Sequence, residues 1–236
     1  MELLSGQIKN YKCEQKTALF VFTESDKVKM GAIAIAAGLS GLAAQSAATL
    51  HSSSSLEEEA SFVTFELGDK AVQGWLWRSP FVEEDEVEVV AEWQQDHFEL
   101  YGIRRPKDHI VALYPHCSRG RVSHWRNALK WLSYLIMFIA FITEALMFAI
   151  VFFRKDFDSA MHFSIDILPG LFLIVPFFSL MVWFLGRKWM SYVRLAERTF
   201  TVFGWANPKI IDLVKSSNAQ RTGNEPRGYG TFFFRY

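Results

Sequence analysis

The sequence lacks the residue patterns on which most enzymes depend. It has 2 Cys, too few for a disulfide framework or a Cys-x-x-Cys metal site. No Gly-rich phosphate loop, no Ser-His-Asp order and no pair of carboxylates in an apolar pocket pattern occurs. The opening residues, MELLSGQIKNYK, also lack the apolar core of a secretory signal. These absences predict a protein that is not an enzyme, uses no cofactor or metal, and keeps its cysteines reduced.

Apolar residues are instead concentrated in two long runs. Residues 131–153 contain only three clearly polar side chains, and residues 167–185 contain only one. At about 1.5 Å per helical residue, each run can cross a hydrocarbon core of roughly 30 Å. The alternative, a buried hairpin of a soluble bundle, would need polar residues at helical spacing, and neither run has them. The runs therefore predict two transmembrane helices joined by a loop over residues 154–166.

Basic residues flank the two runs unequally. The intervening loop begins with Arg154 and Lys155, whereas the outer flanks carry Arg119, Arg121, Arg126, Lys130, Arg187, Lys188, Arg194 and Arg198. Since positive charge is retained on the cytoplasmic side, both termini should face the cytoplasm and the loop the periplasm. We expect the first six of these outer residues to anchor the chain at the lipid headgroups.

The formal net charge of +0 hides an asymmetry between the two halves. Residues 1–115 contain 10 Lys and Arg against 18 Asp and Glu, and residues 116–236 contain 15 against 7. The basic half should be drawn to anionic lipid and the acidic half held away from it. A lipid bilayer is therefore the predicted partner. Nucleic acid is not, because the basic residues cluster where a membrane already explains them.

Before the first run, short stretches rich in β-branched and aromatic residues alternate with turns. They cover residues 2–10, 17–23, 61–67, 70–78, 86–93, 97–103 and 109–114. About seven strands at this spacing predict a small, closed or nearly closed barrel of OB or SH3-like type over residues 1–115. The alternation slips at Gly102, which predicts a bulge. The acidic run over residues 83–88 predicts a solvated edge.

The predicted fold class is an α+β membrane protein. A cytosolic β-barrel is followed by a basic collar (116–130), the two-helix transmembrane hairpin and a cytosolic helical tail (186–236). In that tail we expect a helix that breaks at Asn207-Pro208 and a second, short helix that begins at Pro208. The aromatic end of the tail docks either on the barrel or at the membrane interface, through Phe232, Phe233, Phe234 and Tyr236.

An insert rich in Ala, Gly and Ser interrupts the barrel over residues 29–60. Two interpretations are open. The first is a surface helix followed by a Ser-rich linker. The second is a segment that enters or lies on the membrane, favoured by small-xxx-small spacing at Ala34 and Gly38 and at Ala37 and Gly41.

The stretch YPHCSRGRVSHW (114–125) combines a His-Cys pair with arginines. A cysteine phosphatase loop needs an arginine six residues after the nucleophile, where this chain has Ser123. Zinc could use His109, His116, Cys117 and His124, but their spacing matches no closed-site pattern. We favour a plainer interpretation, in which a turn ends the barrel and a basic, aromatic collar follows at the headgroup level.

One ionisable residue, Glu144, lies near the middle of the first run. A carboxylate there costs on the order of a few kcal/mol, so it should be protonated, paired or facing water. In the plainer interpretation it snorkels or sits neutral in a helix interface. In the functional interpretation Glu144, Thr143 and Ser179 line a polar seam through which cations leak in an oligomer. The second run contains residues that favour a kink, namely Pro169, Gly170 and Pro176.

Several segments together resemble a known family. These are EVEVVAEW (86–93), HFELYGIRRP (97–106), LYPHCSRG (113–120), the two-run hairpin and LAERTF with FGWANPKIIDL (195–213). The combination is similar to a bacterial family of type VI secretion system effectors, in which a member is either the effector or its immunity factor. The resemblance implies an inner-membrane protein of interbacterial competition whose partner is a cognate effector or immunity protein.

Three functions follow as hypotheses. The first is an antibacterial effector that inserts in the inner membrane of a competitor, forms a homo-oligomer there and depolarises it. The second is an inner-membrane immunity protein that neutralises a cognate effector. The third is a housekeeping membrane protein whose barrel binds a protein or lipid. Toxicity on expression would support the effector, and protection of a target cell would support the immunity protein. A chain that neither poisons nor protects the cell would support the housekeeping protein.

Overall fold

The computed structural model describes residues 1–18, 20, 58–154 and 174–236 of the chain. They form two compact units. One unit combines Met1–Gly120 with Tyr192–Tyr236, and the other is Arg121–Ser191.

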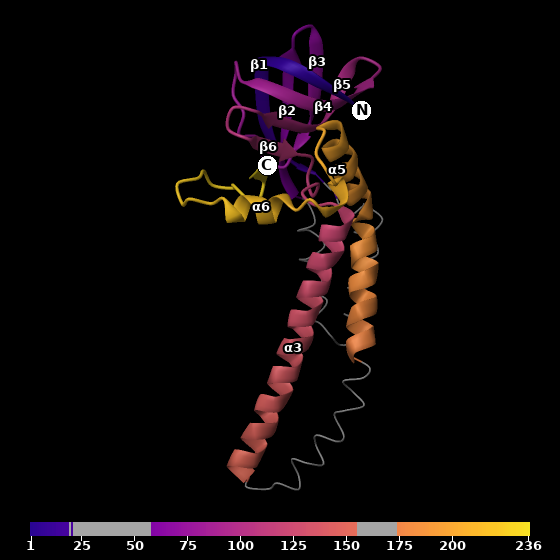
Figure 1. Ribbon diagram of the computed structural model, residues 1–236, viewed down its shortest axis with the longest axis vertical. Helices are drawn as coiled ribbons and strands as arrows, with labels where there is room; N and C mark the ends of the chain where they lie inside the picture. Colours follow the sequence, from indigo (N-terminus) through magenta and orange to yellow (C-terminus); the bar gives the residue numbers. More distant parts are fainter. Residues whose placement is uncertain (19, 21–57, 155–173) are drawn as a thin grey trace, which may run out of the picture. The chain divides into compact units, whose positions relative to one another are not determined.

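The first unit is built on a closed β-barrel (Figure 1). Its described strands are β1 (Glu2–Ala18), β2 (Glu58–Leu67), β3 (Lys70–Leu76), β4 (Glu86–Gln94), β5 (His97–Arg105), β6 (Ile110–Leu113) and β7 (Phe233–Arg235). The sheet order is β3-β2-β1-β4-β5-β6-β7, and an additional parallel pairing of β3 with β5 closes five strands into a ring. This is the connectivity of an OB-like barrel, and the prediction of such a barrel is confirmed.

Strand β1 pairs with two different strands along its length. Its first residues pair with β4 and its later residues pair with β2, with a register shift between Lys9 and Lys12. At the shift Asn10 has a φ of 54°, and the Glu83 carboxylate accepts the backbone N–H groups of Asn10 (2.8 Å) and Tyr11 (2.7 Å). The predicted pair of strands over residues 2–10 and 17–23 is therefore one bent strand, with residues 19 and 21–23 outside the described residues.

The acidic run over residues 83–88 is not a simple solvated edge. Glu83 caps the bend of β1, Asp85 pairs with Arg105 at 2.5 Å, and Glu88 pairs with Arg104 at 2.5 Å. Glu83, Glu84 and Glu86 are exposed, as predicted, whereas Asp85 and Glu88 are partly buried. The alternating pattern of the run could not reveal these pairings because their partners lie far away in the sequence.

The predicted bulge near Gly102 is confirmed. The pairing of β4 with β5 shifts register between Val90 and Ala91, opposite Gly102 and Leu100. A Cβ atom at Gly102 would lie 2.8 Å from Leu113 Cδ2 and 2.9 Å from Thr199 Cγ2. The bulge therefore places a glycine on the outer face of the sheet, where a helix packs too closely for any larger side chain.

That helix is α5 (Met190–Val202), which buries Ala196, Thr199 and Phe200. A second apolar core lies between it and the outer faces of the strands, and includes Val90, Val111, Leu113, Ala196, Phe200, Phe203, Leu213 and Phe234. The predicted break at Asn207-Pro208 is also present, since a 3-10 helix η1 (Pro208–Ile210) begins there. The tail from Tyr192 onward is thus part of the barrel unit and not a separate helical domain.

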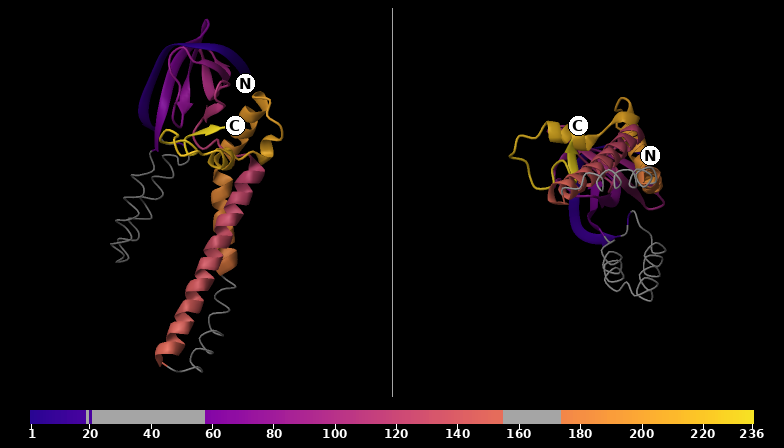
Figure 2. Two further views of the ribbon diagram at one scale, coloured as in Figure 1. Left: turned by 60° about the vertical axis from the view of Figure 1, so that its left-hand side comes forward. Right: turned by 90° about the horizontal axis from the view of Figure 1, so that it is seen from below.

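The end of the tail docks on the barrel, which is the first of the two predicted docking sites, the barrel and the membrane interface. Strand β7, the yellow arrow beside the C label in the left view of Figure 2, pairs antiparallel with β6. Its Phe233 and Phe234 side chains are buried. The outer edge of β7 is covered by α6 (Leu213–Ala219). There the Ser217 hydroxyl accepts the Arg235 N–H at 2.8 Å, and the Ser216 hydroxyl donates to the Arg235 carbonyl at 3.2 Å.

Ser217→Ala should lower the free energy of unfolding of the barrel unit by about 1 kcal/mol, since it removes the buried hydroxyl that accepts the partly buried Arg235 N–H. Thermal unfolding of the purified chain in detergent would measure the change. Thr231→Ala, at an exposed position in the same tail, is the control and should leave the midpoint unchanged. Equal midpoints for both variants would contradict a role for Ser217 in holding β7.

The second unit contains α3 (Arg121–Arg154) and helical residues 174–188. Helix α3 begins well before the predicted span, because the basic collar over residues 121–130 is its first turns and not a separate segment. By length and composition, the described residues contain one candidate membrane span, Arg121–Ala149, and none of its most apolar stretch is buried. The second predicted span is described only from residue 174, and the predicted loop only at Arg154.

Candidate functional site

Helix α3 presents large apolar side chains that no part of the described chain covers. Phe141 is 69% exposed and Phe148 is 73% exposed, and similar side chains surround the helix. Exposed apolar surface costs roughly 25 cal/mol per Å² in water. Because the apolar residues follow no single stripe, the helix needs an apolar environment on several sides, as lipid provides.

Basic and aromatic residues are paired near one end of each apolar helix. The Lys130 ammonium lies 5.5 Å from the centre of the Tyr134 ring, and the Arg187 guanidinium lies 4.6 Å from that of Trp183. Both pairs are one helical turn apart, so each helix carries a cation–π contact on its own surface. Such residues are typical of the level where a membrane helix leaves the hydrocarbon core.

The two helices of this unit meet at Gly186. A Cβ atom there would lie 2.8 Å from the Trp125 indole, so only glycine lets the backbone approach this ring. Trp125 belongs to the first turns of α3 and Gly186 to the last turn of helical residues 174–188. The contact therefore brings together the two ends that carry the basic residues.

Of the six predicted headgroup anchors, Arg119 has another role. Its Nε donates to Asp212 Oδ1 at 3.1 Å, within the barrel unit. Asp212 also caps α6 by accepting the Lys215 N–H at 3.0 Å. The other five anchors lie in the helical unit, namely Arg121, Arg126, Lys130, Arg187 and Lys188. Their contact with lipid stays a prediction.

The predicted polar seam is not assembled by contacts among the described residues. Thr143 donates to the carbonyls of Ile139 (2.7 Å) and Ala140 (2.9 Å) of its own helix, and so has no need of another partner. Glu144 is exposed, and no described hydrogen bond or ion pair joins it to Ser179. Of the predicted kink residues, Pro176 lies in the described helix, whereas Pro169 and Gly170 lie outside the described residues.

The histidines and the cysteine of the 109–124 region do not gather into one site. Cys117 is buried and donates to the Tyr192 carbonyl at 3.4 Å, and burial raises its pKa, which makes it a poor nucleophile. His116 Nε2 lies 2.7 Å from Glu58 Oε2. Burial lowers the His116 pKa, and Glu58 opposes that shift. His109 packs against Tyr236, and among the described residues no group of His, Cys, Asp or Glu could hold a metal ion.

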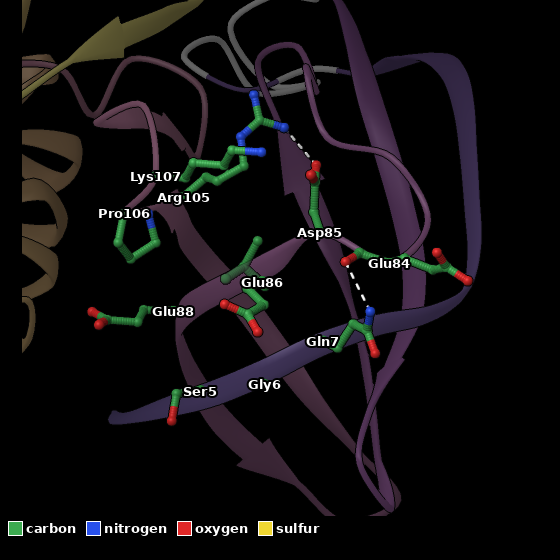
Figure 3. A pocket seen from close by; sticks show the side chains of 11 residues that line it. Ser5, Gly6, Gln7, Glu84, Asp85, Glu86, Glu88, Arg105, Pro106 and Lys107 are labelled. Atoms are coloured by element: carbon green, nitrogen blue, oxygen red, sulfur yellow. Dashed lines mark hydrogen bonds and ion pairs between the residues drawn. The ribbon is translucent and has the colours of Figure 1, made fainter.

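A charged hollow of about 520 Å³ lies on the barrel where β1 meets the start of β4 and the end of β5 (Figure 3). Its side chains include Ser5, Gln7, Glu84, Asp85, Glu86, Glu88, Arg105 and Lys107. Register explains the arrangement, since Ser5 pairs with Glu88 and Gln7 with Glu86. Gln7 Nε2 donates to the Glu84 carbonyl at 3.1 Å, which ties β1 to the loop before β4.

Arg105 organises one wall of this hollow. Its guanidinium pairs with Asp85 at 2.5 Å and with Asp108 at 2.7 Å. Burial raises the Asp108 pKa, but the hydrogen bond and charge of Arg105 outweigh it and hold that pKa below its ordinary value. The partly buried Arg105 guanidinium is therefore bound by two carboxylates. Sequence reasoning missed this hollow, and the signal that could have located it is the charge complementarity between the acidic run over residues 83–88 and RRPKD (104–108).

No protein-family model, no curated protein and no solved structure matches the chain.

The Asp108 carboxylate makes the stability of the folded chain depend on pH. Its pKa is lower in the folded chain than in the unfolded one, so its stabilising effect is complete above the unfolded value near 4 and is lost as the pH falls through the folded value. Unfolding of the wild type, followed by circular dichroism between pH 6 and pH 2, should therefore show a stability loss that is smaller in Asp108→Asn. Parallel pH profiles for the two proteins would contradict the pairing with Arg105.

Proposed function

We propose that the chain is a membrane protein of bacterial competition that inserts in the inner membrane of a competitor cell and depolarises it. The observation that carries the membrane part is α3, whose apolar side chains are exposed along the helix. The cation–π pairs at Lys130 and Arg187 support it, because they lie where headgroups would meet the helices. The depolarising activity follows from the family resemblance and from Glu144 within the apolar stretch.

The second apolar run completes a transmembrane hairpin in this proposal. The contact of Gly186 with Trp125 supports it, since a helix that returns to the first turns of α3 has crossed the bilayer in the opposite direction. Both termini then lie in the cytoplasm, and the loop over residues 154–166 lies in the periplasm. In this arrangement the hairpin binds lipid through its sides, while the barrel is free to bind a partner in the cytoplasm.

Topology can be tested with cysteine labelling. The exposed native Cys13 should react with a membrane-impermeant maleimide only after cell lysis, whereas Lys155→Cys in a Cys13→Ser background should react in intact spheroplasts. The buried Cys117 serves as the unreactive internal reference. Labelling of Cys13 before lysis, or recovery of the chain in the soluble fraction after carbonate extraction, would contradict the proposed topology.

Depolarisation can be tested by expression in a sensitive bacterial cell with a potential-sensitive dye. Wild-type chain should collapse the membrane potential, and Glu144→Leu should restore most of it, because an apolar side chain cannot stabilise a passing cation. Thr143→Val is the matched control, since the Thr143 hydroxyl is bonded to its own helix and its loss should have little effect.

An unchanged potential on wild-type expression would overturn the depolarising function. Harmless expression that protects the cell from a toxin encoded beside this chain would identify an immunity protein instead.

A further inference from the structure

The outward face of β2, β3 and β5 carries a row of aromatic side chains. Phe62 lies opposite Trp75 in the register of β2 with β3, and their ring centres are 5.2 Å apart. Tyr101 continues the row on β5 and is partly exposed, like the other two. The Lys16 ammonium lies 4.8 Å from the centre of the Phe62 ring. One end of the row therefore already holds a cation of the chain itself.

A polar row runs beside the aromatic one. Successive register pairs place one residue from each barrel strand in line, in the order Lys12, Thr64, Gln73, Glu99 and Glu92. Their sequence neighbours Val63, Val72 and Leu100 are buried in the barrel, so the members of the row point outward.

Two carboxylates lie side by side at the end of the polar row. Glu92 and Glu99 are direct cross-strand partners, a placement that destabilises a sheet unless cations are near. His97 Nε2 lies 3.5 Å from Glu99, and the amino terminus lies 3.7 Å from Glu92. Since 29% of the Glu99 side chain and 47% of the Glu92 side chain stay exposed, both remain accessible to an external cation.

We propose that this aromatic–acidic face, formed by Phe62, Trp75, Tyr101, Gln73, Glu92 and Glu99, binds an Arg- or Lys-bearing extended segment of a partner protein. Aromatic rings and carboxylates both attract such side chains, and the guanidinium of Arg can stack on one and bond to the other. The two adjacent carboxylates Glu92 and Glu99 disfavour nucleic acid on the same face. This partner site lies on the barrel and goes beyond the membrane activity proposed above.

The test uses the full chain in nanodiscs of zwitterionic phosphatidylcholine, with fluorescein-labelled octa-arginine as the probe and fluorescence anisotropy as the measurement. Binding should weaken as salt rises. Glu99→Gln and Trp75→Ala should each weaken it by at least about fivefold, the scale of one desolvated cation–π or charged contact. Because Trp75 also packs against Phe62, Glu99→Gln gives the decisive result if Trp75→Ala fails to fold by circular dichroism.

Matched controls come from other surfaces of the barrel. Glu86→Gln removes a carboxylate of the charged hollow, and Trp93→Ala removes a Trp that is 54% exposed and contacts Phe98. Both should bind octa-arginine like the wild type. Equal loss in Glu86→Gln and Glu99→Gln would show non-specific attraction to acidic surface and overturn the proposal. Binding of an oligothymidine strand in preference to octa-arginine would overturn it as well, and neither result bears on membrane depolarisation.

Discussion

The barrel depends on one close approach between backbones. Gly74 on β3 lies so near β5 that a Cβ atom there would be 2.9 Å from the backbone N and O of Leu100. Only glycine allows β3 to pair in parallel with β5, and this pairing converts an open sheet into a ring. The ring in turn fixes which side chains face inward, so the buried core, the charged hollow and the aromatic–acidic face all follow from it.

The chain combines two units whose surfaces demand opposite surroundings. The barrel unit buries its apolar residues in two cores and binds its charges in pairs such as Arg104 with Glu88. The helical unit does the reverse, since it exposes phenylalanines and keeps its basic residues near the ends of its helices. A single solvent therefore satisfies the surface of only one of the two units.

Local patterns predicted much of this architecture. Alternation located β2 to β6, the slip at Gly102 located the bulge, and Asn207-Pro208 located the start of η1. Each of these depends on neighbours in the sequence. The bend of β1, the docking of β7 and the hollow around Arg105 depend instead on partners tens of residues away, and short-range periodicity carries no information on such pairings. The aromatic–acidic face was missed for the same reason, because cross-strand register brings its members together.

Strand β7 and helix α5 come after both apolar runs in the sequence, yet they complete the barrel unit. A ribosome makes the chain from its amino end, so β1 to β6 leave it long before the residues that cover Val111 and Leu113 exist. During that interval the outer face of the sheet is bare while both apolar runs are being synthesised. Completion of the barrel unit is thus postponed until the last residues of the chain have been made, and the apolar outer face of the nascent sheet is exposed in the meantime.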